Sequence, residues 1–100
     1  MARKLEDSAA QLAALGHPVR LGILRAVVKG PQEGTPAGDL QARLDIPAST
    51  LSHHLATLSQ AGLVTAERQG TFLLYRAEFK ALRALTDFIW EDCCGGGACC

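Results

Sequence analysis

The sequence predicts an α+β domain that is mostly helical, with the element order helix, helix, helix, helix, hairpin, helix. Apolar residues recur every three or four positions through most of residues 8–62 and again after Glu78, which is the spacing of helices with one buried face. Residues 63–77 instead hold two runs rich in strand-forming side chains around a polar Gln69-Gly70 tip, which is typical of a hairpin.

Length and charge limit the classes of protein to consider. One hundred residues are enough for one small domain with a modest core. Ten basic residues balance ten acidic ones, so evidence for a nucleic-acid partner must come from local features. The first 18 residues do not have the pattern of a secretory signal, and no apolar stretch approaches the roughly 20 residues of a membrane span. We therefore expect a cytoplasmic protein without a membrane partner.

The first three helices have recognisable start signals. Ser8, followed by Gln11 three residues later, predicts a capping box at the start of the first helix. Pro18 is suited to the first position of the second helix, because a proline lacks only an N–H that would be unpaired there. Thr35 followed by Pro36 predicts the start of a short third helix, and the "DIP" sequence at residues 45–47 ends it.

The second half of the chain completes the fold prediction. The fourth helix begins near residue 48 and ends at Gly62, a favourable residue for a helix end. The strands Leu63–Glu67 and Thr71–Ala77 form the hairpin, and the last helix follows from Glu78. A short helix, a tight turn, a polar-faced helix and a hairpin together predict a winged helix-turn-helix.

The fourth helix has an outward face that is short, polar and uncharged. On a helical wheel, the apolar side of this helix contains Ala48, Leu51, Leu55 and Leu58. His54 lies nearer that side, and we expect it to be packed and structural. Small hydroxyl, amide and imidazole groups can approach base edges and phosphates, although any solvated helix also exposes such groups. The DNA-contacting candidates on the wheel are Ser49, Ser52, His53, Thr57 and Gln60, with Ala56 beside them.

The hairpin strengthens the prediction of DNA binding. Residues 66–76 contain Arg68 and Arg76 against the single acid Glu67. A tip made of Gln69, Gly70 and Thr71 could enter a minor groove while Arg68 contacts a phosphate. Either arginine taken alone is more often ordinary protein surface than a DNA contact.

Three segments resemble the ArsR/SmtB family of metal-sensing winged-helix repressors: "ALGHPVRLGIL", "LDIPASTLSHHLATLSQAGLV" and "RQGTFLLYR". The similarity spans about residues 8–90. It implies a homodimer paired through the first and last helices, which binds a palindromic operator in double-stranded DNA and leaves it when an inducer binds. The apolar last helix independently favours a dimer. The family's DNA-reading positions correspond here to Ser49, Thr50, Ser52, His53 and residues 68–71.

The familiar inducer sites of this family are absent from this sequence. The arsenic-type site needs cysteines in the third helix, which reads "AGDLQARL" and has none. The zinc-type site needs aspartate and histidine on the last helix, where "EFKALRALTDFIW" has no histidine. His17 is better explained by its position before the Pro18 helix start than as a ligand. We therefore divide the chain into a DNA-binding and dimerisation domain, residues 1–90, and a cysteine-rich inducer-binding tail, residues 91–100.

The tail, "EDCCGGGACC", contains all four cysteines of the chain. Thiolates select soft ions, and As(III) binds three sulfurs in a pyramid. The adjacent Cys93 and Cys94 could supply two sulfurs, and Cys99 or Cys100 the third. We predict As(III) as the inducer, with Sb(III) second and no organic cofactor.

Other interpretations of the tail remain open. Zn, Cd or Pb sensing, a redox switch, a thiol-rich metal carrier and an inactive tail are the alternatives. An enzyme is disfavoured, because no catalytic set of side chains is evident.

Overall fold

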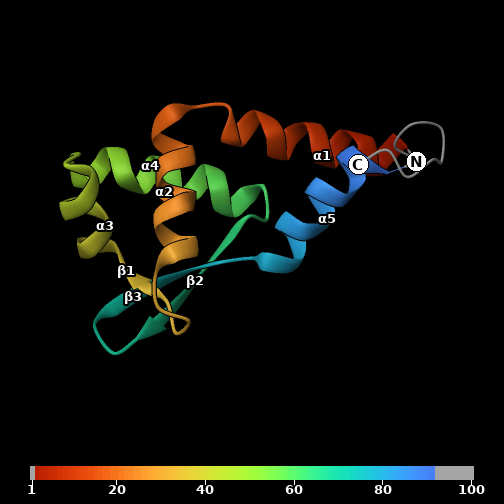
Figure 1. Ribbon diagram of the computed structural model, residues 1–100. Helices are drawn as coiled ribbons and strands as arrows, with labels where there is room; N and C mark the ends of the chain where they lie inside the picture. The colour runs from red at the N-terminus through yellow and green to blue at the C-terminus, as the bar shows by residue number, and fades with distance from the viewer. Residues whose placement is uncertain (1, 92–100) are drawn as a thin grey trace.

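The computed structural model describes residues 2–91, and this part of the chain folds into five helices and a small sheet (Figure 1). The α+β, mostly helical prediction is therefore confirmed. None of these helices is both long and apolar enough to span a bilayer. In chain order the elements are α1 Ala2–Leu15, α2 Pro18–Lys29, β1 Thr35–Pro36, α3 Ala37–Leu44, α4 Ala48–Gln60, β2 Val64–Gln69, β3 Phe72–Ala77 and α5 Phe79–Trp90.

The sheet has the antiparallel order β1-β3-β2. β2 and β3 form the predicted hairpin, whose register runs from Val64 opposite Ala77 to Gln69 opposite Phe72. Gly70 has a φ of 62°, a left-handed conformation that suits glycine in a tight reversal. We call this β2–β3 hairpin the wing.

The core forms where α4 packs against α2 and the base of the wing. Leu51, Leu55 and Leu58 of α4 are all buried, as are Ile23 of α2 and Leu63 just before β2. Each such side chain contributes roughly 1.5–3 kcal/mol when it leaves water. α4 ends where Gly62 adopts a φ of 77°, as the sequence predicted. Since one face of α4 is buried, its opposite face is exposed.

α1 and α5 lie side by side at one end of the molecule, away from α3 and the tip of the wing (Figure 1). Lys4 Nζ of α1 lies 3.4 Å from a carboxylate oxygen of Glu91, just after α5. α1 also reaches α4, because Gln11 Nε2 donates to the carbonyl oxygen of Ala61 over 3.1 Å. The first helix therefore contacts both the last helix and the end of α4.

The capping box predicted at Ser8 is wrong. α1 begins at Ala2, and Ser8 is buried in the middle of the helix. No helix-breaking residue precedes Ser8, so the helix extends upstream through Leu5. Ser8 lies beside a shallow hollow between α1 and α5 that Ala81 and Ala84 also line, where small side chains allow the two helices to approach closely.

The helix start predicted at Thr35 and Pro36 is also wrong. These two residues form β1, in which Thr35 pairs with Tyr75 of β3, and α3 begins one residue later at Ala37. Thr35 is buried, so pairing with the sheet determines its conformation more than its capping preference does. The predicted break after α3 is confirmed, because Asp45 adopts a left-handed φ of 52° between α3 and α4.

Two glycines near β1 provide a matched test of this packing. Gly34 has a φ of 121°, and a Cβ atom there would lie 2.8 Å from Leu74 Cβ. We expect Gly34→Ala to lower the free energy of unfolding by about 2 kcal/mol through backbone strain and overlap. Gly38→Ala in α3, where a Cβ would meet nothing within 4 Å, should raise it by about 0.5–1 kcal/mol. Urea unfolding measures both, and equal effects would contradict this description of the β1 region.

Candidate functional site

The first half of α4 exposes the predicted DNA-contacting residues together. Ser49, Ser52 and His53 are exposed, and Thr50 is half-buried beside them. The helix starts after Pro47 without a side-chain cap, so its first backbone N–H groups have no side-chain partner within residues 2–91. Unpaired N–H groups and the positive end of the helix dipole favour a phosphate at this position. The arrangement therefore combines a phosphate-binding helix end with polar side chains able to reach base edges.

Thr57 and Gln60 lie apart from this group, toward the other end of α4. The hydroxyl of Thr57 donates to the carbonyl oxygen of His53 over 3.2 Å. The hydroxyl proton is therefore already used in a hydrogen bond within the helix. Both residues line a shallow hollow beside α1 with Ala10 and Ala13. Recognition helices contact bases mainly through their N-terminal residues, so the geometry favours Ser49 to His53 over this pair.

The wing exposes every residue predicted at its tip. Arg68, Gln69, Gly70 and Thr71 are all accessible to solvent. Arg76 forms an ion pair with Glu67 on the neighbouring strand, which neutralises part of the wing's charge. The ion pairs within residues 2–91 leave Arg68 without an acidic partner. Arg68 is therefore the wing's candidate for a phosphate contact.

Phe72 is a candidate that the sequence analysis missed. Its side chain is 64% exposed at the tip of the wing, opposite Gln69. The sequence predicts that Phe72 belongs to the strand Thr71–Ala77, where a run of apolar residues does not indicate which face is buried. Its position directly after the Gly70-Thr71 reversal was the available signal. Apolar side chains at such tips can insert at base steps in a minor groove.

His54 is buried, as the sequence predicted. Its side chain is 7% exposed on the inner face of α4. Burial lowers the pKa of His54 below its ordinary value of 6.5, and His17, Arg20 and His53 lower it further. The ring is therefore neutral near pH 7 and serves a packing role.

His17 has the role expected from its position before Pro18. It is the N-cap of α2, and its Nδ1 accepts a hydrogen bond from the backbone N–H of Val19 over 3.2 Å. In the part of the chain that the structure describes, no three His, Cys, Asp or Glu side chains gather into a metal-binding group. The predicted ligands Cys93, Cys94, Cys99 and Cys100 lie outside the described residues.

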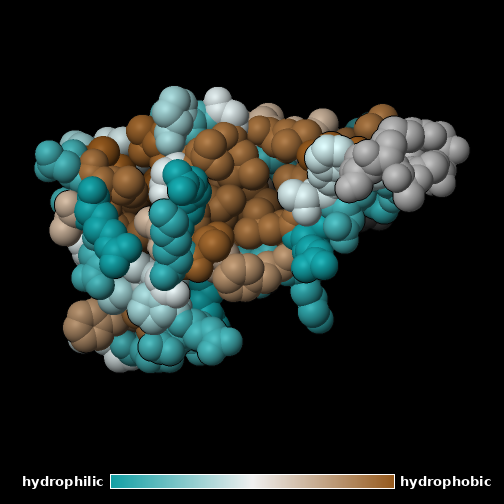
Figure 2. Space-filling model, viewed as in Figure 1, coloured by the Kyte–Doolittle hydropathy of each residue, from teal (hydrophilic) through white to brown (hydrophobic). Residues whose placement is uncertain are grey.

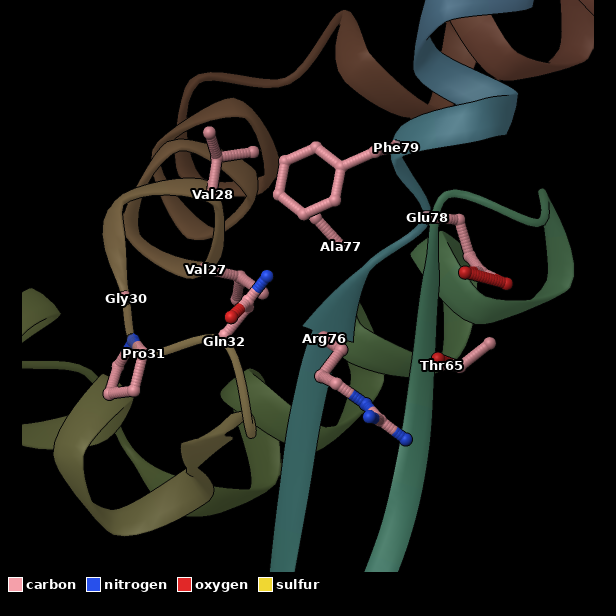
Figure 3. A pocket seen from close by; sticks show the side chains of 10 residues that line it. All are labelled: Val27, Val28, Gly30, Pro31, Gln32, Thr65, Arg76, Ala77, Glu78 and Phe79. Carbon is pink, nitrogen blue, oxygen red and sulfur yellow. The ribbon is translucent and has the colours of Figure 1, made fainter.

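A hollow of about 700 Å³ lies between the end of α2, the base of the wing and the start of α5 (Figure 3). The ring of Phe79 lies beside Val28 and Ala77, whereas the side chains of Arg76 and Glu78 extend away from this apolar group (Figure 3). The lining of the hollow consists of Val27, Val28, Gly30, Pro31, Gln32, Thr65, Arg76, Ala77, Glu78 and Phe79.

Comparison with known proteins agrees with this geometry. A helix-turn-helix domain family matches residues 15–67. The HTH-type transcriptional regulator YgaV of Escherichia coli is 38% identical over 80 residues, covering 80% of this chain and 79% of the relative. The HTH-type transcriptional repressor SmtB of Mycobacterium tuberculosis is 37% identical over 75 residues, which cover 74% of this chain and 53% of SmtB.

A solved structure shows the same arrangement. An ArsR-like transcriptional regulator from Rhodococcus sp. RHA1 superposes with a TM-score of 0.76 at 26% identity, covering 85% of this chain and 77% of that one.

An exposed recognition helix and a wing at one end of the fold define a DNA-binding transcription regulator of the winged helix-turn-helix class, and not an enzyme. Within that class, the chain belongs to the ArsR/SmtB family of transcriptional repressors.

Arg68 can be tested through the salt dependence of DNA binding. We expect Arg68→Gln to weaken binding to all duplexes about equally, and to reduce the slope of log K against log salt concentration by about 1. The probe is a duplex selected from a random pool, titrated by fluorescence anisotropy at several salt concentrations. Arg83→Gln on α5, which removes an exposed charge far from the wing tip, should leave the slope unchanged. An unaltered slope in Arg68→Gln would exclude a phosphate contact there.

Proposed function

We propose that this protein is an As(III)-responsive repressor, with Sb(III) as a second inducer. The apo form binds operator DNA through the first half of α4 and the wing. It leaves the operator when thiolates of Cys93, Cys94 and one of Cys99 and Cys100 bind the metalloid. The observation that carries this proposal is the pair of adjacent thiols that begins three residues after the end of α5.

The chemistry of this sequence favours a trivalent metalloid. Two adjacent cysteines and a third beyond a glycine-rich spacer provide three soft ligands on a short stretch of chain. Zinc prefers four ligands in a tetrahedron, to which adjacent cysteines are poorly suited. A redox switch would use the same thiols, but Glu91 and Asp92 would disfavour the reactive thiolate.

A homodimer is the second part of the proposal. Figure 2 shows a broad hydrophobic area on the face where α1, α2 and α5 meet. Water-exposed apolar side chains on this scale indicate a surface that another molecule covers. In a symmetric dimer, two copies of α4 would be presented to successive turns of DNA. The large hydrophobic side chains exposed on these helices are Leu5, Leu12, Leu21, Val28, Phe79, Ile89 and Trp90.

A series of contacts connects the end of α5 with the recognition helix. Glu91 lies next to Lys4 of α1, and the Lys4 ammonium also lies 5.1 Å from the centre of the Phe88 ring. α1 in turn holds the end of α4 through Gln11 and the carbonyl oxygen of Ala61. Gathering thiolates of residues 93–100 around one ion would change the path of the chain at Glu91. These contacts offer a route from that change to the angle between the two recognition helices.

The inducer site is tested by arsenite titration of the reduced protein bound to the selected duplex. We expect arsenite to lower operator affinity by roughly 5- to 150-fold, the usual range for such coupling. Cys93→Ser/Cys94→Ser should bind the duplex as well as the unmodified protein but retain it when arsenite is added. Parallel titrations with Zn(II), Cd(II), Pb(II) and peroxide test the other inducers. Equal release of the double variant by arsenite would refute the proposed site.

The dimer is tested by placing a charge on α5. Ile89→Lys should convert the protein to a monomer, because a buried ammonium without a partner costs several kcal/mol. Phe72→Lys is the matched control, since Phe72 is also a largely exposed apolar residue (64%, against 55% for Ile89) but lies at the tip of the wing. Sedimentation equilibrium should show a monomer for the first variant and a dimer for the second. If both variants were dimers, α5 would be excluded from the dimer interface.

A further inference from the structure

The recognition helix is connected to the rest of the protein by a half-buried arginine that the repressor function leaves unexplained. Arg20 lies in the first turn of α2, and its Nε donates to the carbonyl oxygen of Ala14, near the end of α1, over 2.6 Å. Its Nη1 lies 3.4 Å from Nδ1 of His54 in α4. One guanidinium therefore joins α1, α2 and α4.

These contacts require His54 to be neutral. A guanidinium only donates hydrogen bonds, so Nδ1 of His54 must be the acceptor and the ring proton must be on Nε2. The ring of His17 lies 4.7 Å from that of His54, and its Nδ1 is also an acceptor, from the N–H of Val19. Protonation of His54 would remove the acceptor of this contact and place a positive charge next to that of Arg20.

The surroundings of His54 provide no compensating negative charge. The titratable or charged groups of residues 2–91 that act on it are His17 and Arg20 from the start of α2, and His53 on α4 itself. α1, α3 and β2 also pack against α4, and none of them contributes a carboxylate to this effect. Without a counter-ion, a protonated His54 would be a desolvated cation beside the cation of Arg20.

We propose that Arg20 and His54 are positioning residues for DNA binding, which hold α4 in its DNA-reading orientation and release it when the medium becomes acidic. The effector in this inference is the proton. The inference rests on DNA binding by α4 but is independent of arsenic. It also gives His54 a role beyond packing.

The direction of the effect follows from linkage. The packed His54 binds a proton less readily than a free histidine, so the arrangement keeps its full stability above about pH 6.5 and loses it as the pH falls below that value. A positive charge gained on the exposed face of α4 would have the opposite effect, because it would attract the phosphates of DNA and strengthen binding. A loss of affinity for DNA in acid would therefore point to the buried ring of His54 as its cause, and not to the exposed face of α4.

The test measures the affinity of the full chain for the duplex selected at pH 7.5, between pH 7.5 and 5.5. We expect the unmodified protein to lose about 10-fold in affinity at pH 5.5. His54→Asn retains an acceptor for Arg20 but cannot be protonated, so its loss should be less than about 2-fold. His53→Asn, the matched control on the same helix, should keep the acid-dependent loss whatever its starting affinity. Equal losses in the unmodified protein and His54→Asn, or no loss in the unmodified protein, would overturn the proposal.

A second measurement needs neither DNA nor a folded variant. In NMR titrations of the unmodified protein, the Arg20 Nε–H resonance and the α4 amides should shift with the same midpoint as the His54 ring. An Arg20 signal that does not follow His54 would overturn the proposal even if the selected duplex binds normally. If no duplex can be selected at any pH, the proposed DNA binding is refuted. The NMR titration alone then decides whether the contact between Arg20 and His54 responds to acid.

Discussion

The burial of one stripe of α4 is the constraint on which the rest of this structure depends. Leu51, Leu55 and Leu58 recur at helical spacing and pack onto α2 and the base of the wing. Burying this stripe turns Ser49, Ser52 and His53 outward, whatever their own preferences. The same core fixes the wing relative to α4, since Leu63 and Val64 at the base of β2 belong to it. A single hydrophobic contact surface thus positions both candidate DNA-binding elements.

Periodicity alone was enough to predict most of this fold. The wheel of α4, the Pro18 helix start, the hairpin and the last helix follow from spacing and from residues with one strong preference. The helix starts predicted at Ser8 and Thr35 are wrong, because a residue that favours a cap also fits inside a helix or at a sheet edge when tertiary contacts require it. The exposure of Phe72 was missed, since an apolar run does not indicate which of its faces is buried, and only the position beside the Gly70-Thr71 reversal pointed to the tip. Nor does the sequence separation of Arg20 and His54 suggest their contact.

The candidate DNA-binding elements and the proposed dimer helices lie in different parts of the fold. α3, α4 and the wing occupy one end of the molecule, whereas α1 and α5 lie together at the other. Polar side chains link the two ends at separate points, through Gln11 with the carbonyl of Ala61 and through Arg20 with His54. Both links attach to α4, so signals of different chemical origin would act on the same helix. A chain of only 100 residues would thus respond to two effectors through one helix.

The ion pair between Arg76 and Glu67 has a consequence for how such a regulator would search a genome. It neutralises one of the wing's two positive charges, in a chain whose overall charge is already zero. Long-range attraction to arbitrary sequence would then be weak, and dwell times on the bulk of the chromosome short. Retention of the regulator at its operator would depend on the fit between the two surfaces and on short-range contacts. Small distortions would therefore suffice to clear a promoter, and little protein would be sequestered elsewhere.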